Sequence, residues 1–238
     1  MNTAIILAGG VGSRMNTDNI PKQYIQIKDR RIIDYCLNTF QKHPLIDRIV
    51  IAADPIWVPM IDESLSRFQV DKFIGYSNPG ITRQFSIFHA LQLLEDNTQD
   101  MDMVIIHDAA RPLVSPRLIT ECLSAAEHYD GVMPVLPVKD TLYRSKNKKE
   151  IFELLPREEL FAGQAPESFR YGKYLKCHYQ MSKEEMMTIN GSSEIAYKNH
   201  MNILLIPGEE RNFKITTNED LELLNMYLEK ETINQQSP

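Results

Sequence analysis

Cysteine is scarce in this sequence of 238 residues. The three cysteines, Cys36, Cys122 and Cys177, lie far apart and form no Cys-x-x-Cys pair. An odd number of widely spaced cysteines argues against a disulfide framework or a zinc site and favours reduced thiols. We therefore expect a cytoplasmic protein that needs no cross-links.

Long apolar runs are also missing. The N-terminal MNTAIILAGG has only a few apolar residues and no preceding basic residues, which is not the pattern of a secretory signal peptide. No stretch approaches the ~20 apolar residues that a membrane helix needs. We expect a protein without membrane association.

Positive charge is in deficit, because 26 Lys and Arg stand against 32 Asp and Glu, for a net charge of −6. This balance argues against a nucleic-acid coat or a polybasic membrane anchor. A hydrophobic content of 43%, with 13 Pro and 10 Gly, is ordinary for a globular protein, and the length predicts one domain over residues 1–238. An anionic ligand would have to be met by basic residues that are gathered locally.

Short β-rich apolar runs alternate with helical periodicities along the chain. The predicted strands are residues 3–8, 48–53, 72–76, 103–107, 131–135 and 202–206. Between them apolar residues recur on single helical faces, and Thr217 with Asp220 predicts the cap of a last helix. This alternation predicts an α/β fold, with a mainly parallel sheet covered by helices on both faces and a ligand crevice at the carboxyl ends of the strands.

A polar, charged stretch from about residue 137 to 164 breaks this rhythm and has no buried-strand run. It predicts either a solvated hairpin or an arm that packs on a second subunit. The sequence alone leaves both interpretations open.

A glycine-rich loop follows the first predicted strand directly, with the sequence Ala8-Gly9-Gly10-Val11-Gly12-Ser13-Arg14-Met15. Glycines let backbone N–H groups approach an anion. The loop lacks the third glycine of a dinucleotide-binding fingerprint and the Gly-Lys-Ser/Thr of a P-loop. Arg14 and the nearby Lys22 suit a triphosphate, although a structural turn with two solvated cations is the alternative.

Further polar residues follow other predicted strands. Asp108, at the end of the central strand, is a candidate Mg²⁺ ligand, whereas the preceding His107 is better explained as a core histidine than as a base. Gly80 opens a helix in which Ser86 could hydrogen-bond a base edge. Lys214 stands among apolar neighbours and is a candidate phosphate ligand, with a snorkelling surface lysine as the alternative.

Five segments together resemble one family. AGGVGSRM with PKQY, then GITRQFSI, HDAARP, PVKDT and NFKIT are similar to the CTP-dependent cytidylyltransferases that act on sugar-alcohol phosphates. That family includes 2-C-methyl-D-erythritol 4-phosphate and ribitol 5-phosphate enzymes, and the resemblance runs from about residue 3 to 228. It implies a Rossmann-like α/β fold with a protruding dimerisation arm, a homodimer, and transfer of CMP from CTP to a polyol phosphate with release of pyrophosphate.

The resemblance also implies roles for single residues. It implies that Arg14, Lys22 and Lys214 stabilise the α-phosphorus and that Asp108 serves Mg²⁺. It implies CTP contacts for Ala8, Gly9, Gly10, Gly12, Ser13, Gly80, Ser86 and Ala109. It implies that the acceptor phosphate is met across the dimer by Thr141 and Arg157, with Lys139 and Asp140 adjacent.

The sequence departs from the methylerythritol enzymes in three places. Ala165-Pro166-Glu167 stands where they usually have Thr-Pro-Gln, Arg211 stands where they usually have Asp, and Gly163-Gln164 is common in ribitol-type enzymes. These departures favour D-ribitol 5-phosphate as the acceptor, with 2-C-methyl-D-erythritol 4-phosphate as the alternative. The alternatives from other classes are a non-catalytic nucleotide-binding scaffold, an oxidoreductase with Asp54 after its second strand, and a sugar 1-phosphate nucleotidyltransferase.

Overall fold

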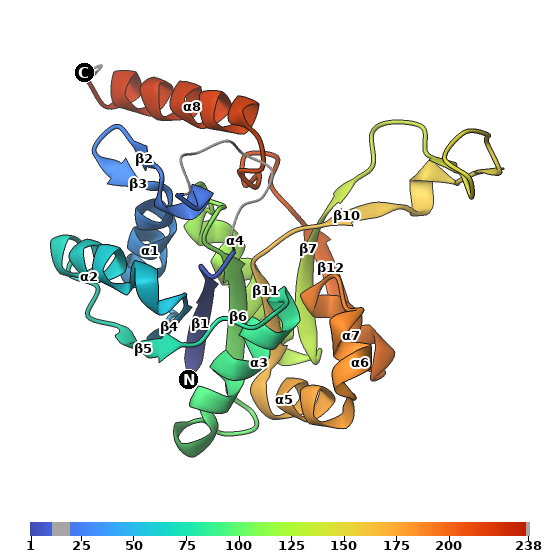
Figure 1. Cartoon of the computed structure of the whole chain (residues 1–238), viewed down its shortest axis with the longest axis horizontal. Coiled ribbons are helices and arrows are strands. Elements are labelled where there is room, and N and C mark those ends of the chain that lie inside the picture. The colour runs from blue at the N-terminus through green and yellow to red at the C-terminus, as the bar shows by residue number, and fades with distance from the viewer. Residues whose placement is uncertain (11–19, 237–238) are drawn as a thin grey trace.

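The computed structural model describes residues 1–10 and 20–236 and shows one central sheet between two layers of helices (Figure 1). The sheet contains eight strands. In spatial order they are β12 (Ile203–Pro207), β7 (Gly131–Pro137), β11 (Glu167–Arg170), β6 (Met103–Asp108), β1 (Asn2–Leu7), β4 (Arg48–Ala52) and β5 (Phe73–Ser77), with β10 (Phe161–Gly163) beside the far end of β7.

Parallel pairing dominates this sheet. The pairs β1–β4, β1–β6, β4–β5 and β7–β12 are parallel, whereas β10 and β11 run antiparallel to their neighbours. All six predicted strands are present within one or two residues of their expected bounds. The predicted α/β fold is confirmed.

The two faces of the sheet are covered by different helices because side chains alternate along each strand. Ala4 and Ile6 of β1 pack with α1 (Ile32–Lys42), α2 (Val58–Arg67) and α4 (Pro116–Ser124). Ile5 points to the opposite face, where it packs with α3 (Arg83–Leu93), α5 (Tyr171–Gln180) and α7 (Ser192–Lys198). The short helix α6 (Lys183–Met187) contacts α3.

A third apolar cluster lies under the last helix, α8 (Asn218–Gln236), and includes Leu224 and Leu228. It covers the small hairpin of β2 (Gln26–Ile27) and β3 (Arg30–Arg31). The predicted cap of α8 is present, since Asp220 Oδ2 accepts from the N–H of Thr217 at 2.9 Å. Five 3-10 turns complete the described elements: η1 (Lys22–Tyr24), η2 (Pro55–Trp57), η3 (Glu95–Asn97), η4 (Ala125–Glu127) and η5 (Arg157–Glu159).

An arm projects from the sheet between β7 and β10 (Figure 1). It carries a two-stranded hairpin, β8 (Tyr143–Arg144) with β9 (Glu153–Leu154), and most of its residues are exposed. This agrees with the polar stretch that breaks the strand rhythm of the sequence. Among the described residues, no helix is long and apolar enough to cross a membrane.

Candidate active site

The glycine loop and the following PKQY segment are joined at the carboxyl end of β1. The carbonyl of Ala8 accepts from Gln23 Nε2 at 2.5 Å and from the Tyr24 hydroxyl at 2.9 Å, and Gln23 Nε2 also donates to the carbonyl of Gly10. Gln23 and Tyr24 are buried, so these bonds fix the start of the loop. Lys22 immediately precedes them in η1.

The predicted loop residues Gly12, Ser13 and Arg14 lie outside the described residues. Gly9 lies against the turn that follows β5, where a Cβ on Gly9 would come within 2.5 Å of Pro79 Cβ. Gly9 and that turn therefore lie together at the carboxyl ends of β1 and β5.

Gly80 and Ser86 are directly connected. The N–H of Gly80 donates to Ser86 Oγ at 2.9 Å, and the same hydroxyl donates to the carbonyl of Thr82 at 3.2 Å. A Cβ on Gly80 would lie only 2.2 Å from Phe85 Cβ, so the turn requires glycine here. The Ser86 hydroxyl holds the turn in shape and keeps one lone pair for a ligand.

Asp108 is the centre of a charge cluster at the carboxyl end of β6. Its Oδ1 accepts from Arg83 Nε at 3.1 Å, and its Oδ2 accepts from Lys214 Nζ at 2.9 Å. Arg111 Nε lies 3.5 Å from Oδ2. Burial alone would raise the pKa of Asp108, but the three cations outweigh burial and hold that pKa well below its ordinary range. Asp108 is therefore a permanent anion at neutral pH.

His107 supports this cluster from inside the core. It is fully buried, and its Nε2 lies 3.0 Å from the carbonyl of Arg111, which assigns the ring proton to Nε2. Burial lowers the pKa of His107 to about 4, so the ring is neutral at physiological pH. It fixes the turn after β6 and has no access to a ligand.

The loop that carries Lys214 is held by the segment at the base of the arm. The Gln164 amide donates to the carbonyl of Glu209 at 2.9 Å and accepts from the Glu209 N–H at 3.0 Å. Asn212 Nδ2 donates to the carbonyl of Ala165 at 2.6 Å, and the carbonyl of Asn212 accepts from Arg111 at 2.7 Å. These bonds place Lys214 beside Asp108.

Arg211 points toward α8, with its guanidinium 5.2 Å from the ring centre of Tyr227. The change from Asp to Arg thus adds a cation beside α8. Ala109 is buried, and its N–H donates to the carbonyl of Leu7 at 3.0 Å.

Two residues of the cluster are not predicted from the sequence. Arg83 lies inside the GITRQFSI motif, and its guanidinium contacts both Asp108 and Glu167, the latter at 3.8 Å. Burial opposes the charge of Arg83, but Asp108 and Glu167 outweigh it and raise its pKa. In the sequence, Glu167 stands out only as a departure from the family motif, and no pattern in the sequence predicts its contact with Arg83.

The predicted acceptor residues lie on the exposed arm. Arg157 donates to the carbonyl of Lys139 at 3.0 Å, and Lys139 Nζ forms an ion pair with Glu210 on the loop that carries Lys214. Asp140 and Thr141 follow Lys139 in the sequence and are exposed. Among the described residues, the polar contacts of Lys139 and Arg157 are with each other, Glu158 and Glu210, and do not reach Asp108.

Asp108 is the candidate metal ligand at this site. The described parts of the chain contain no group of three or more His, Cys, Asp or Glu side chains arranged to hold a metal ion. Both oxygens of Asp108 are engaged, so a metal ion would have to replace Lys214 or Arg83. Asp108 can supply one ligand at most, which is the number that Mg²⁺ bound to substrate phosphates often takes.

Known proteins resemble this chain over nearly its whole length. The family model described as 2-C-methyl-D-erythritol 4-phosphate cytidylyltransferase (IspD) matches residues 2–230. The chain belongs to the IspD family. It is therefore a cytidylyltransferase, one of the nucleotidyltransferases, as the resemblance implies.

Similar proteins carry two different names, and this chain is compared with one of each. It is 34% identical over 229 residues to the 2-C-methyl-D-erythritol 4-phosphate cytidylyltransferase of Clostridium novyi, covering 96% of both chains. It is 31% identical over 238 residues to the ribitol-5-phosphate cytidylyltransferase of Lacticaseibacillus paracasei, covering 97% of this chain and all of the relative. Such similar identities do not separate the two acceptors.

Solved structures match over the same length. The 2-C-methyl-D-erythritol 4-phosphate cytidylyltransferase of Francisella tularensis has a TM-score of 0.78 and 28% identity, covering 94% of this chain and 98% of that one. The 4-diphosphocytidyl-2C-methyl-D-erythritol synthase of Anaerococcus prevotii has a TM-score of 0.81 at 23% identity, covering 96% of each chain, and supports the fold.

Proposed function

We propose that this IspD-family chain transfers CMP from CTP to D-ribitol 5-phosphate and releases pyrophosphate and CDP-ribitol. The observation that carries the transfer is the Asp108 cluster, in which three cations meet one ionised carboxylate beside Leu7 at the end of β1. 2-C-methyl-D-erythritol 4-phosphate is the alternative acceptor.

The preference for ribitol 5-phosphate rests on the segment at the base of the arm. Gln164, of the Gly-Gln pair common in ribitol-type enzymes, holds the backbone of Glu209 through two hydrogen bonds. Glu167, which replaces the usual Gln, lines a hollow of about 680 Å³ together with Ser193 and Tyr197. The preference itself rests on the departures from the methylerythritol enzymes at Gly163-Gln164, Glu167 and Arg211.

The reaction is an in-line attack of the acceptor phosphate oxygen on the α-phosphorus of CTP. Two polyanions must approach, so the protein's task is to position them and to neutralise charge. Lys22, Lys214 and Arg14 are the cations proposed for the triphosphate. Each close charge pair is worth about 4 kcal/mol near an effective dielectric constant of 20.

Lys214 has a defined resting place for this role. Its side chain is 36% exposed and its amine is held by Asp108 Oδ2, so a phosphate can compete for the amine from solvent. Asp108 is ionised throughout the physiological range and therefore acts through its charge, not as an acid. Gly80, Ser86 and the backbone at Ala109 are proposed to meet the cytosine, and Ala8, Gly9, Gly10, Gly12 and Ser13 the phosphates and ribose.

Mg²⁺ is proposed to enter with CTP, since most of its ligands must be phosphate oxygens at a site with one carboxylate. Asp108 is the residue that would hold it from the protein side. When bound, Mg²⁺ neutralises charge on the triphosphate.

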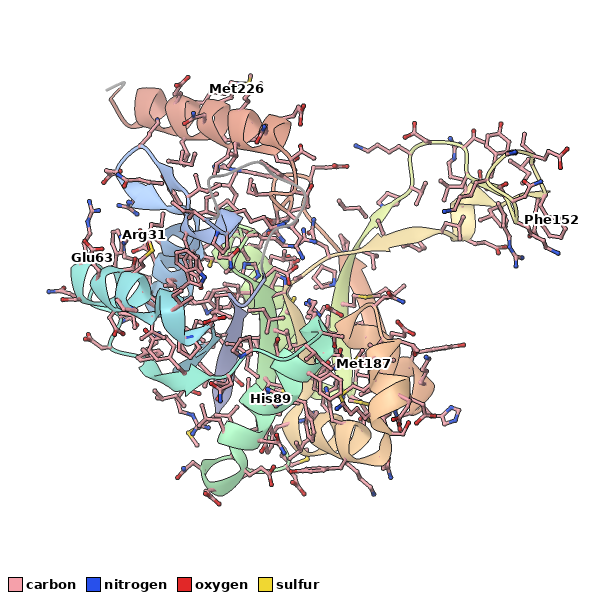
Figure 2. The ribbon with its side chains drawn as sticks, in the orientation of Figure 1. Arg31, Glu63, His89, Phe152, Met187 and Met226 are labelled. Atoms are coloured by element: carbon pink, nitrogen blue, oxygen red, sulfur yellow. The ribbon has the colours of Figure 1, made fainter. Side chains whose placement is uncertain are left out.

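The arm is proposed to pack on a second copy of the chain. Five of its apolar side chains are at least half exposed, which a monomer would leave in water: Tyr143, Ile151, Phe152, Leu154 and Phe161. Figure 2 shows Phe152 at the far end of the arm, well away from the body of its own chain. In such a dimer Thr141, Arg157, Lys139 and Asp140 would meet the acceptor phosphate of the neighbouring site.

A pyrophosphate-release assay tests the proposal. CTP and Mg²⁺ are supplied with ribitol 5-phosphate, methylerythritol 4-phosphate or other alditol phosphates in turn. The proposal expects kcat/KM at least about tenfold higher for ribitol 5-phosphate, a difference of about 1.4 kcal/mol. A higher kcat/KM for methylerythritol 4-phosphate would show that this alternative is the preferred acceptor. CTP binding without turnover on any acceptor would favour a nucleotide-binding scaffold.

A further inference from the structure

Glu167 occupies a position that no predicted role explains. It is the first residue of β11, and its side chain is 9% exposed. Its Oε2 accepts from the N–H of Ser193 at 3.0 Å and from the Ser193 hydroxyl, while its Oε1 lies 3.8 Å from Arg83 Nη2. One carboxylate thus connects the beginning of α7 with the guanidinium that holds Asp108.

Arg83 divides its donors among three partners. Its Nε donates to Asp108 Oδ1 at 3.1 Å, its Nη1 donates to the Ser192 hydroxyl, and its Nη2 faces Glu167. Nε and Nη2 lie on the same side of a guanidinium and form the fork that commonly binds both oxygens of one carboxylate. Here the fork is split between two carboxylates, so Asp108 Oδ2 is left for Lys214 at 2.9 Å.

We infer that Glu167 is a positioning residue for the cytidylyl transfer. By drawing Nη2 of Arg83 away from Asp108, it keeps the second oxygen of Asp108 for the Lys214 amine. Without the negative charge at position 167, both donors of Arg83 close on Asp108 and displace that amine from its resting place. The inference rests on the proposed role of Lys214 in the transfer.

Glu167→Gln removes this effect with little change of shape. The amide has one acceptor oxygen, where the carboxylate has two. If that oxygen keeps the two bonds from Ser193, the NH₂ group faces Arg83 Nη2, donor against donor. If the amide turns over, Ser193 loses its acceptor. In both orientations the attraction for Arg83 is gone.

Arg83→Lys is the partner variant, because a lysine amine cannot form the fork. Wild type, both single variants and the double variant are compared at a temperature where circular dichroism shows all four folded. Glu167→Gln is expected to lower kcat by about tenfold to 100-fold, with KM for CTP changed less than about twofold. On the Arg83→Lys background the same substitution is expected to change kcat less than about twofold. Wild-type kcat in Glu167→Gln, or the same loss on both backgrounds, would overturn the inference.

A second measurement needs no acceptor. Lysines are dimethylated with ¹³C, which keeps their charge, and the Lys214 signal is assigned by its absence in Lys214→Ala. Glu167→Gln is expected to move that signal toward the position of a solvated lysine, and an unmoved signal would overturn the inference. A wild-type protein that turns over no acceptor would refute the proposed function, whereas this comparison would still decide the role of Glu167.

Discussion

The amine of Lys214 lies 2.9 Å from Oδ2 of Asp108, although 106 positions separate the two residues in the sequence. Asp108 ends the central strand β6, and Lys214 stands on the loop between β12 and α8. Arg83 approaches the same carboxylate from α3, and Arg111 from the turn directly after β6. A chain with a net charge of −6 thereby concentrates positive charge at one point of its fold.

Lys214→Ala is expected to lower kcat by about 100-fold or more, because it removes a cation proposed to stabilise charge in the transition state. Asp108 keeps two arginine partners in this variant, so the fold should persist. Steady-state kinetics at saturating CTP measure the loss. Lys173→Ala is the control, since Lys173 also pairs with an aspartate, Asp130, but on another part of the surface. A near-wild-type rate in Lys214→Ala would remove this residue from the catalytic set.

Gly10→Ala separates a ligand contact from a folding requirement. Among the described residues, a Cβ on Gly10 would meet no atom within 4 Å, whereas a Cβ on Gly9 would lie 2.5 Å from Pro79 Cβ. We expect Gly9→Ala to lower the melting temperature and Gly10→Ala to leave it unchanged within about 1 °C, yet to raise KM for CTP by about tenfold or more. Unchanged CTP affinity in Gly10→Ala would contradict the proposed contact between this loop and the nucleotide.

Gln164→Ala is expected to loosen the loop that carries Lys214. The substitution leaves the N–H and the carbonyl of Glu209 without their side-chain partner, which costs about 1 to 3 kcal/mol of folding free energy at a buried position. Chemical denaturation measures this loss, and kcat should fall with it. Gln26→Ala, which removes an exposed glutamine that donates to the carbonyl of Lys28, is the matched control. Equal stability changes in the two variants would show that the two hydrogen bonds between Gln164 and the Glu209 backbone do not stabilise the fold.

Two of the buried histidines, His107 and His178, make stability depend strongly on pH. Burial lowers the pKa of both His107 and His178 to about 4, from an ordinary value near 6.5. Between these values the unfolded chain binds the proton and the folded chain does not, so stability is full above pH ~6.5 and falls as the pH drops toward 4. Each histidine accounts for about 3 kcal/mol over that range, from about 1.4 kcal/mol per pKa unit.

His107→Gln should therefore flatten the dependence of unfolding free energy on pH by about one proton between pH 6.5 and 4. Urea denaturation at several pH values gives the slope. An unchanged slope would mean that His107 is not kept neutral by its surroundings.

Leu154→Asp tests the arm as a dimer contact. Leu154 is 62% exposed in the single chain, so a charge there should not disturb the fold of that chain. We expect the variant to sediment as a monomer and to lose activity, because Thr141 and Arg157 are proposed to serve the neighbouring site. Ile56→Asp, at a position on the body that is 72% exposed, is the control and should remain dimeric. A Leu154→Asp variant that remains dimeric would show that Leu154 of the arm is not part of the dimer interface.

The fold follows from local patterns to a large extent. Apolar runs mark the six strands that lie in the sheet interior or pair in parallel, and the cap at Thr217 marks the start of α8. β11 carries no such mark, because Glu167-Ser168-Phe169-Arg170 has one apolar residue. Its burial comes from its place between β6 and β7, which only the complete sheet defines.

The site divides in the same way. Asp108, Lys214 and the glycine loop stand at the ends of predicted strands, where a parallel sheet gathers its ligand-binding groups. Arg83 and Glu167 join the cluster through a tertiary contact between residues that are 84 positions apart in the sequence. Neither segment contains a pattern that predicts this contact. The hydrogen bonds between Gln164 and Glu209 likewise depend on the antiparallel pairing of β10 with β7 at the end of the arm. The sequence shows this region only as a polar stretch.

The most direct test of the account is a competition between the two acceptors. CTP, Mg²⁺ and equal concentrations of ribitol 5-phosphate and 2-C-methyl-D-erythritol 4-phosphate are mixed with the protein, and the products are followed by ³¹P NMR. The account predicts pyrophosphate together with CDP-ribitol as the first nucleotide product, and formation of the methylerythritol product first would contradict it.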